Sequence, residues 1–248
     1  MSADQAKFCV IIPAAGKSER FGGEEKKSFV KLDGRPVFLR TIELFISRDD
    51  VCQTILAVSP EDMGTLRTQY GANLGFMDVQ LVEGGPRRCD TVAAALKAVS
   101  PKADFVAVHD AARPCTAHDR IDAVFAEARK TAAAILACPI AGTIKRATPQ
   151  RVIEETLSRI SLYEAQTPQV FRANVLIDAY AKLSPMADDI TDDSLVVERS
   201  GHPVSIVISD ASNLKITTKS DLSLASAILK CRPHRPSTRM GIFEEAQW

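Results

Sequence analysis

Basic residues and glycines that could hold a phosphate follow the first apolar run of the chain. The run FCVII (8–12) is typical of a buried strand, and the loop after it, PAAGKSERFGGEEKK (13–27), carries Arg20 and Lys27. A glycine-bearing loop between a strand and a helix can present backbone N–H groups to phosphate. The letters GKS resemble the end of a P-loop, but Ile11 stands where that motif requires its first glycine. The loop therefore predicts a phosphate site of another kind, with a solvated basic loop as the alternative.

Three further loops carry glycines or side chains suited to binding. They are EGGPRRCDTV (83–92), VAVHDAARP (106–114) and DASNLKIT (210–217). The first could close over a base through its backbone, with an ordinary strand-to-helix turn as the alternative. The second ends an apolar run in Asp110 and Arg113, and carboxylates bind hydroxyls or metal ions while arginine binds phosphate. His109 beside this pair is more typical of a structural histidine, and Lys215 in the third loop is also compatible with a solvated charge.

The alternation of apolar runs and amphipathic segments predicts where these loops lie. Apolar runs predict strands at 9–13, 54–59, 78–83, 105–110, 132–140 and 203–209. Helical patterns lie at about 35–47, 60–69, 88–99, 117–130, 172–183 and 218–230. This order predicts an α/β, Rossmann-like fold, in which a mostly parallel sheet carries helices on both faces. Ligands bind at the carboxyl ends of such strands, where the four loops are expected.

Residues 139–170 break this alternation. TIKRA (143–147) and RVIEET (151–156) are typical of two strands around the turn TPQ, and no crossover helix fits. We predict a projecting β-hairpin arm at about 139–165. Because a lone hairpin is marginal in water, we expect it to pack against something, with a second subunit as the candidate. Residues 1–230 would then form a single domain and 231–248 a loose tail.

Composition argues against several classes of function. The 248 residues are 46% hydrophobic, and 31 Lys and Arg balance 31 Asp and Glu. This balance argues against broad nucleic-acid binding, and no apolar run is long enough to span a membrane. We expect no signal peptide. Six cysteines without a C-x-x-C pair predict reduced thiols in the cytoplasm rather than a zinc site.

Taken together, the motifs resemble those of the 2-C-methyl-D-erythritol 4-phosphate cytidylyltransferase family. The resemblance covers about residues 8–230 and rests on IPAAGKSERFGGEEKKSF, VEGGPRRCDTVAAAL, VHDAARP, TIKR, AQTPQVF, ITDD and NLKIT, in that order. It implies a nucleotidyltransferase of isoprenoid precursor biosynthesis that joins CTP to a sugar-alcohol phosphate and releases pyrophosphate. It also implies a homodimer formed through the arm, and a divalent ion, normally Mg²⁺, bound mainly through the CTP phosphates.

The resemblance assigns roles to individual residues, with no metal ligand among them. Arg20 and Lys27 match the catalytic cations. The nucleotide-binding positions are Ala14, Ala15, Gly16, Gly85 and Thr91. The acceptor-binding positions are Asp110, Arg113, Thr143, Arg159, Thr191 and Lys215, of which Thr143 and Arg159 would serve the partner's site.

The implied chemistry requires positioning and charge neutralisation more than proton transfer. A phosphate acceptor is already ionised at pH 7, so no general base is required, and His109 is not assigned as one. The chain departs from the family pattern at Lys26, where proline is usual, at Pro86, where many members carry an acid, and at Gly142 and Ser158 in the arm. Two alternatives are a ribitol-5-phosphate cytidylyltransferase and a non-catalytic nucleotide-binding protein. The presence of both catalytic cations argues against the latter.

Overall fold

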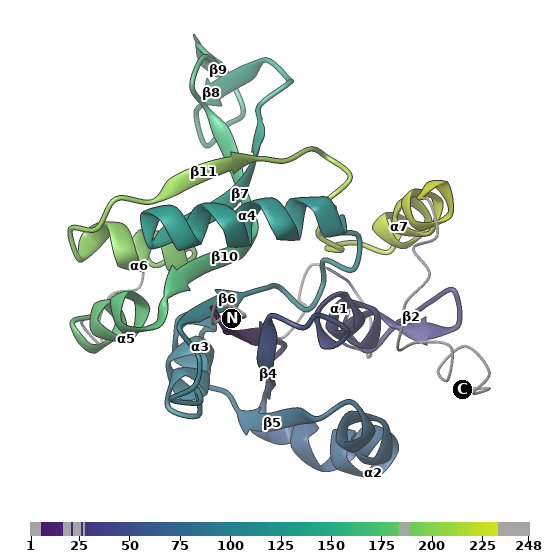
Figure 1. Ribbon diagram of the computed structural model, residues 1–248. Helices are drawn as coiled ribbons and strands as arrows, with labels where there is room; N and C mark the ends of the chain where they lie inside the picture. Colours follow the sequence, from purple (N-terminus) through teal and green to yellow (C-terminus); the bar gives the residue numbers. More distant parts are fainter. Residues whose placement is uncertain (1–5, 17–20, 22–25, 27, 184–188, 233–248) are drawn as a thin grey trace.

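The computed structural model has a central sheet with helices packed on both faces (Figure 1). It describes residues 6–16, 21, 26, 28–183 and 189–232. Within this part of the chain, the strands of the large sheet lie in the order β11-β7-β10-β6-β1-β4-β5. Their bounds are β1 Phe8–Pro13, β4 Val51–Val58, β5 Val79–Glu83, β6 Phe105–Val108, β7 Ala133–Pro139, β10 Tyr163–Arg172 and β11 Ser205–Ile208. The predicted α/β fold with a mostly parallel sheet is confirmed.

Seven helices are described, and six correspond to predicted segments. They are α1 Val37–Ile46, α2 Pro60–Phe76, α3 Arg88–Leu96, α4 His118–Thr131, α5 Ala173–Ala181, α6 Asp193–Arg199 and α7 Ser220–Cys231. Helix α2 continues past the predicted end at residue 69, because Leu74 reaches the core from beyond Gly71. The short α6 was not predicted. Its start depends on the Asp192 side chain, which accepts a hydrogen bond from the Leu195 backbone N–H. None of the described helices is both long and apolar enough to cross a membrane.

Strand β1 shows how one sheet carries two cores. Its side chains alternate between the two faces, as the period of a strand requires. Phe8, Val10 and Ile12 pack with buried residues of α1, α2 and α4. Cys9 and Ile11 pack on the other face with α3, α5 and α6. Every residue of the strand except Pro13 is buried, which explains why its sequence is a continuous apolar run.

Strand β10 was not among the predicted strands. It runs antiparallel to both β6 and β7, whereas the other neighbours in the sheet run parallel. Its buried part contains Gln166, Thr167 and Gln169, each at most 4% exposed. Polar residues and a proline are untypical of a central strand, so the pattern concealed it. The structure shows that these polar side chains have partners at the carboxyl-terminal edge of the sheet.

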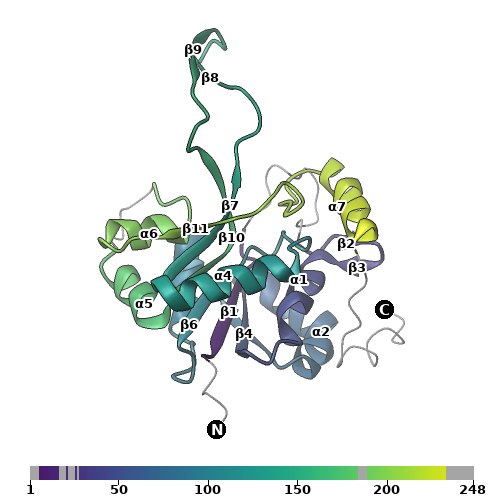
Figure 2. The same ribbon diagram turned by 45° about the horizontal axis from the view of Figure 1, so that its top comes forward.

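Two small hairpins complete the fold. The predicted arm contains β8 Ile144–Ala147 and β9 Ile153–Leu157, an antiparallel pair that projects beyond the sheet (Figure 2). A second pair, β2 Lys31–Leu32 and β3 Arg35–Pro36, lies where the first helix was expected to begin. Its turn residues Asp33 and Gly34 have φ of 47° and 80°, and Asp-Gly is a favoured sequence for such a turn.

Candidate active site

A cavity of about 140 Å³ lies at the carboxyl-terminal edge of the sheet. It is lined by residues 13–16, 85–88 and 110–112, together with Ser28, Thr91 and Lys215. These residues follow β1, β5, β6 and β11, so all four predicted loops contribute to one site. Of the predicted site residues, those that line it are Ala14, Ala15, Gly16, Gly85, Thr91, Asp110 and Lys215.

The turn between β5 and α3 contains two glycines that have no room for a side chain. A Cβ atom at Gly85 would lie 2.5 Å from Cβ of Asp90, and one at Gly84 would lie 2.8 Å from Cγ2 of Thr91. A larger residue at Gly85 would therefore require movement of the start of α3, and one at Gly84 would require movement of the Thr91 side chain. The Thr91 hydroxyl lies 3.1 Å from the carbonyl oxygen of Gly85 and 3.0 Å from that of Arg87, to which it can donate. Thr91 thus holds the shape of this loop beside the cavity.

Three cations converge on the Asp110 carboxylate. Nζ of Lys215 lies 2.7 Å from Oδ2, and the Nε atoms of Arg88 and Arg113 lie 3.3 Å from Oδ1 and 3.5 Å from Oδ2. Burial alone would raise the pKa of Asp110, but the charges of Arg88, Lys215 and Arg113 outweigh it and hold the pKa well below its usual range. Asp193 is the only other carboxylate in this cluster of described residues, so positive charge exceeds negative charge by one. The cluster therefore suits an anionic ligand.

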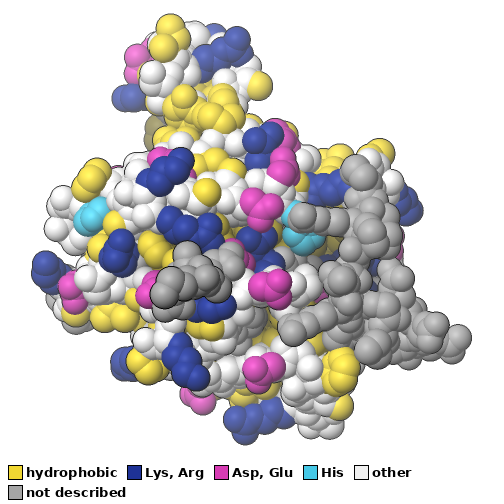
Figure 3. All heavy atoms as spheres, viewed as in Figure 1, with side chains coloured by type: hydrophobic (Ala, Val, Ile, Leu, Met, Phe, Trp, Pro, Cys, Tyr) yellow, Lys and Arg dark blue, Asp and Glu magenta, His cyan; other side chains and the backbone are white. Residues whose placement is uncertain are grey.

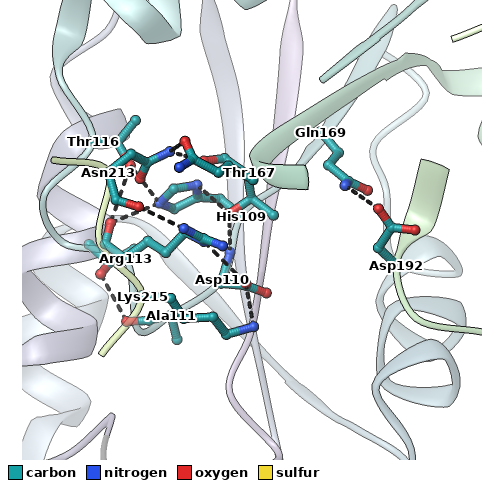
Figure 4. Close-up of polar contacts among 12 residues, drawn as sticks. His109, Asp110, Ala111, Arg113, Thr116, Thr167, Gln169, Asp192, Asn213 and Lys215 are labelled. Carbon is teal, nitrogen blue, oxygen red and sulfur yellow. Dashed lines mark hydrogen bonds and ion pairs between the residues drawn. The ribbon is translucent and has the colours of Figure 1, made fainter. Parts of the chain in front are cut away.

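His109 lies next to Asp110 and Arg113 and is fully buried (Figure 4). The Thr167 hydroxyl accepts from the Asp110 N–H at 3.0 Å, which leaves its hydrogen to donate to Nδ1 of His109 at 3.1 Å. Nε2 of His109 donates to the Arg113 carbonyl at 3.1 Å. Burial lowers the pKa of His109 to about 4, so the ring is neutral at pH 7. Both ring nitrogens have protein partners, as the assignment of His109 to a structural role requires.

Asn213 connects the loop that carries Lys215 to the rest of the site. Its Nδ2 donates to the Thr167 carbonyl at 2.9 Å, and its Oδ1 accepts from the Thr116 hydroxyl at 2.8 Å. Its own carbonyl accepts from Nη1 of Arg113 at 2.6 Å. Figure 4 shows these side chains converging from separate segments of the chain. Asn213 is 2% exposed, so it fixes the loop from within and not from the surface.

Four predicted residues lie away from the cavity lining. Arg113 is 5% exposed and reaches the site through its contact with Asp110. Thr191 is exposed and stands directly before Asp192, which accepts from Nε2 of Gln169 at 2.7 Å (Figure 4). Thr143 and Arg159 flank the strands of the hairpin, where both are exposed.

The two predicted catalytic cations, Arg20 and Lys27, lie outside the described residues. Lys26 between them is described. Its Nζ lies 2.6 Å from Oδ2 of Asp62 and 3.0 Å from the Ser59 hydroxyl, at the start of α2. The residue that replaces the usual proline is therefore itself bound to the start of α2.

Sequence reasoning missed several residues of the site, and Arg88 is the clearest of them. Arg88 lines the cavity and is the first residue of α3, where the helix dipole disfavours a cation. An arginine at that position indicates a specific carboxylate partner, and this signal was available in the sequence. Thr167, Asp193 and Asn213 gave no such signal, because their partners are distant in the sequence.

Comparison with known proteins gives a consistent result. The family model for 2-C-methyl-D-erythritol 4-phosphate cytidylyltransferase matches residues 8–231. The chain is 45% identical over 240 residues to the protein of that name from Rhodopirellula baltica, covering 92% of this chain and 97% of the relative. It is 36% identical over 228 residues to the one from Alkaliphilus oremlandii, with the same coverages. The crystal structure of the Thermus thermophilus enzyme superposes with a TM-score of 0.75 at 28% identity, covering 90% of this chain and 99% of that one. The Francisella tularensis enzyme gives a TM-score of 0.76 at 29% identity, covering 90% of this chain and 100% of that one.

Proposed function

Because the chain belongs to the 2-C-methyl-D-erythritol 4-phosphate cytidylyltransferase family, we propose that it transfers the cytidylyl group of CTP to that acceptor. The products are 4-diphosphocytidyl-2-C-methyl-D-erythritol and pyrophosphate. The observation that carries the proposal is a single cavity lined both by the glycine-containing loop after β5 and by the cationic cluster around Asp110. The loop suits the base of CTP, and the cluster suits the anionic acceptor. The cavity therefore suits both substrates of this reaction.

The described residues act by placing and neutralising the two anions. The acceptor phosphate oxygen attacks the α-phosphorus of CTP in line with the leaving pyrophosphate. Lys215 and Arg113 offset the charge of the acceptor, and Asp110 accepts from its hydroxyl groups. The loop at 14–16 and Gly85 offer backbone to the nucleotide. Proton removal is not required, and this agrees with a buried, neutral His109 whose nitrogens already have partners.

Arg20 and Lys27 complete the proposed mechanism as cations that stabilise the transition state. Each substitution to alanine should lower turnover about 10²–10³-fold, as loss of one preorganised contact does elsewhere. Thermal midpoints should change little. Near-normal turnover of either variant would remove that residue from the mechanism.

We propose Mg²⁺ as the cofactor, held mainly by the phosphate oxygens of CTP. The described residues contain no group of three or more His, Cys, Asp or Glu that could hold a metal ion. Asp110 is engaged by three cations, so its carboxylate suits a sugar hydroxyl better than a metal ion. When bound, the ion offsets the charge of the triphosphate. A chelator should abolish turnover and added Mg²⁺ should restore it.

We also propose that two copies form a homodimer through the hairpin. Val152, Ile153 and Ile160 on the projecting segment are 63%, 61% and 83% exposed. Hydrophobic side chains gather on this part of the surface (Figure 3). Apolar exposure on a hairpin that is marginal alone favours an interaction surface. In the dimer, Thr143 and Arg159 would serve the partner's site. The six cysteines are free thiols, which supports a cytoplasmic location as part of this proposal.

The decisive assay measures pyrophosphate release from CTP with 2-C-methyl-D-erythritol 4-phosphate and, as the matched acceptor, ribitol 5-phosphate. We expect turnover with the first and little with the second. Turnover with ribitol 5-phosphate alone would replace the proposed acceptor, and release with neither would refute the function.

A second assay tests whether sites are shared between subunits. Arg20→Ala chains are co-expressed with Arg159→Ala chains, each inactive alone. In a mixed dimer one site collects both defects and the other collects none. Random pairing should therefore restore about a quarter of the wild-type activity on the logic of twofold symmetry. Mixed dimers as inactive as their parents, or a monomer in solution, would exclude the shared site.

A further inference from the structure

Arg88 bridges two carboxylates, one at the cavity and one in the interior. Its Nη2 lies 2.8 Å from Oδ2 of Asp193, and its Nε lies 3.3 Å from Oδ1 of Asp110. The Asp193 side chain is completely buried, whereas that of Arg88 retains 28% exposure. Asp193 is not among the residues that line the cavity, so it reaches the site through Arg88.

Asp193 is itself fixed by two other elements. The Tyr180 hydroxyl, from α5, donates to its Oδ1 at 2.6 Å. Its backbone N–H, at the first turn of α6, donates to Oε1 of Gln169 on β10 at 3.0 Å. The carboxylate therefore has a defined position before any ligand binds. A buried carboxylate held this firmly can set the orientation of the guanidinium that it meets.

The position of Arg88 explains why one carboxylate partner is insufficient to stabilise its charge. A cation in the first turn of a helix is opposed by the helix dipole, and its burial adds to the cost. If Asp110 were its sole partner, Arg88 would draw that carboxylate toward α3 and away from Lys215. Asp110 already accepts from three cations, and a carboxylate has about four lone-pair sites, so about one is left for a ligand.

We propose that Asp193 is a positioning residue for the acceptor: it engages one side of Arg88, and thereby keeps Asp110 oriented with a free acceptor site for a substrate hydroxyl. The inference rests on the proposed function, in which Asp110 binds the sugar-alcohol phosphate. Tyr180 assists by fixing Asp193. The role is indirect, because neither residue lines the cavity.

The test is the isosteric substitution Asp193→Asn, with steady-state kinetics in both substrates. Loss of one charge-assisted contact should raise KM for the acceptor about tenfold. KM for CTP should stay within about twofold, because the nucleotide wall depends on Thr91 and the glycines. Tyr180→Phe removes a single hydroxyl and should raise acceptor KM about threefold in the same direction.

Asp50→Asn is the matched control. Asp50 is a buried carboxylate that accepts from Arg48 and Arg129 at the start of β4, outside the cavity lining. It should lose stability without a change in either KM. If Asp193→Asn leaves acceptor KM unchanged, or raises both KM values alike, the inference is wrong. If that variant does not fold, Tyr180→Phe decides by the same criterion.

A double-mutant cycle separates a route through Arg88 from a direct effect. In an Arg88→Met background, Asp193→Asn should cause no further rise in acceptor KM, because the connection is already absent. Multiplicative effects of the two substitutions would overturn the inference. Wild-type turnover in the same assay tests the proposed function separately: an inactive wild type refutes that function, whereas an active wild type with an unaffected Asp193→Asn refutes this inference alone.

Discussion

Two buried carboxylates surrounded by cations lie at opposite edges of the sheet. They differ in whether the positive charge around them is fully balanced by carboxylates. Asp110 follows β6 at the carboxyl-terminal edge, and Asp50 precedes β4 at the amino-terminal edge. They are 7% and 6% exposed, so burial does not distinguish them. Arg48 and Arg129 surround the second carboxylate, whereas Arg88, Arg113 and Lys215 surround the first.

The distinction lies in charge balance and in what covers the cations. At Asp50 the two arginines also lie over aromatic rings, Arg48 at 4.9 Å from the centroid of Phe125 and Arg129 at 4.8 Å from that of Phe8. Asp122 adds a second carboxylate to Arg48, so the charges balance. A hollow of about 350 Å³ reaches Arg48, larger than the cavity at Asp110. Size alone therefore does not single out the cavity at Asp110, whereas its surplus of positive charge distinguishes it from the hollow at Arg48.

The largest effect should follow loss of the carboxylate at the cavity. In the proposed mechanism, Asp110→Asn removes the anion that orders Lys215 and Arg113 and that binds the acceptor hydroxyl. We expect kcat/KM for the acceptor to fall about 10²–10³-fold, in line with loss of a charged contact to substrate and of preorganised cations. Steady-state assays at saturating CTP measure this. If kcat/KM falls by less than about threefold, the two carboxylates do not differ in function.

The matching change at the other edge should affect stability. Asp50→Asn leaves Arg48 and Arg129 with an uncompensated buried charge, which should lower the free energy of unfolding by about 3–5 kcal/mol. Catalytic parameters should stay within about twofold, since this edge carries no described residue of the cavity. Urea unfolding and kinetics on the same preparation test both statements. A specific loss of acceptor binding in this variant would contradict the structural role.

His109 should make the stability of the chain depend on pH at the carboxyl-terminal edge of the sheet. Its pKa is about 4 in the folded chain against 6.5 for the free side chain. Below pH 6.5 the unfolded chain binds a proton that the folded chain does not. The contribution of His109 to the free energy of unfolding is therefore fully present above pH 6.5. It is lost as the pH falls toward 4, by at most about 3 kcal/mol. Asp110, whose pKa is depressed, loses its contribution only below about pH 3.9, outside this window.

The measurement is the free energy of unfolding at several pH values between 7 and 4 for wild type and His109→Gln. The variant lacks the titrating ring, so its curve should be flatter by up to about 1.4 kcal/mol per pH unit within this window. Parallel curves would show that protonation of His109 does not oppose folding.

The parts of the fold that the sequence predicted are those with apolar periodicity. Strands such as β1 and β6, buried on both faces, are continuous apolar runs, and Asp110 lies just past the carboxyl end of β6, as predicted. Strand β10 was missed because Gln166, Thr167 and Gln169 point into the polar network at the site edge and so break the pattern. Departure from local rules at a site is expected where side chains are selected for binding.

The pairings within the site depend on tertiary structure and could not be predicted. Arg88 meets Asp193, and Arg113 meets the carbonyl of Asn213, across long stretches of chain. No periodicity or spacing encodes such contacts. The resemblance to the family supplied individual positions but no partners for them. The roles of Arg20 and Lys27 stay predictions.

The smallest effect should come from a third arginine–carboxylate pair, which has the same geometry without the enclosure. On the hairpin, Nε of Arg146 lies 3.0 Å from Oε1 of Glu155, the distance that also separates Nε of Arg48 from Oδ1 of Asp50. The hairpin side chains are 61% and 49% exposed, so water screens the pair. A double-mutant cycle with Arg146→Ala and Glu155→Ala should give a coupling energy of about 0.2–1 kcal/mol, smaller still in high salt. The coupling energy is measured by urea unfolding at low protein concentration. A coupling as large as that of Arg48 and Asp50 would show that distance, rather than enclosure, sets the strength of these pairs. The comparison between the two edges of the sheet would then lose its physical basis.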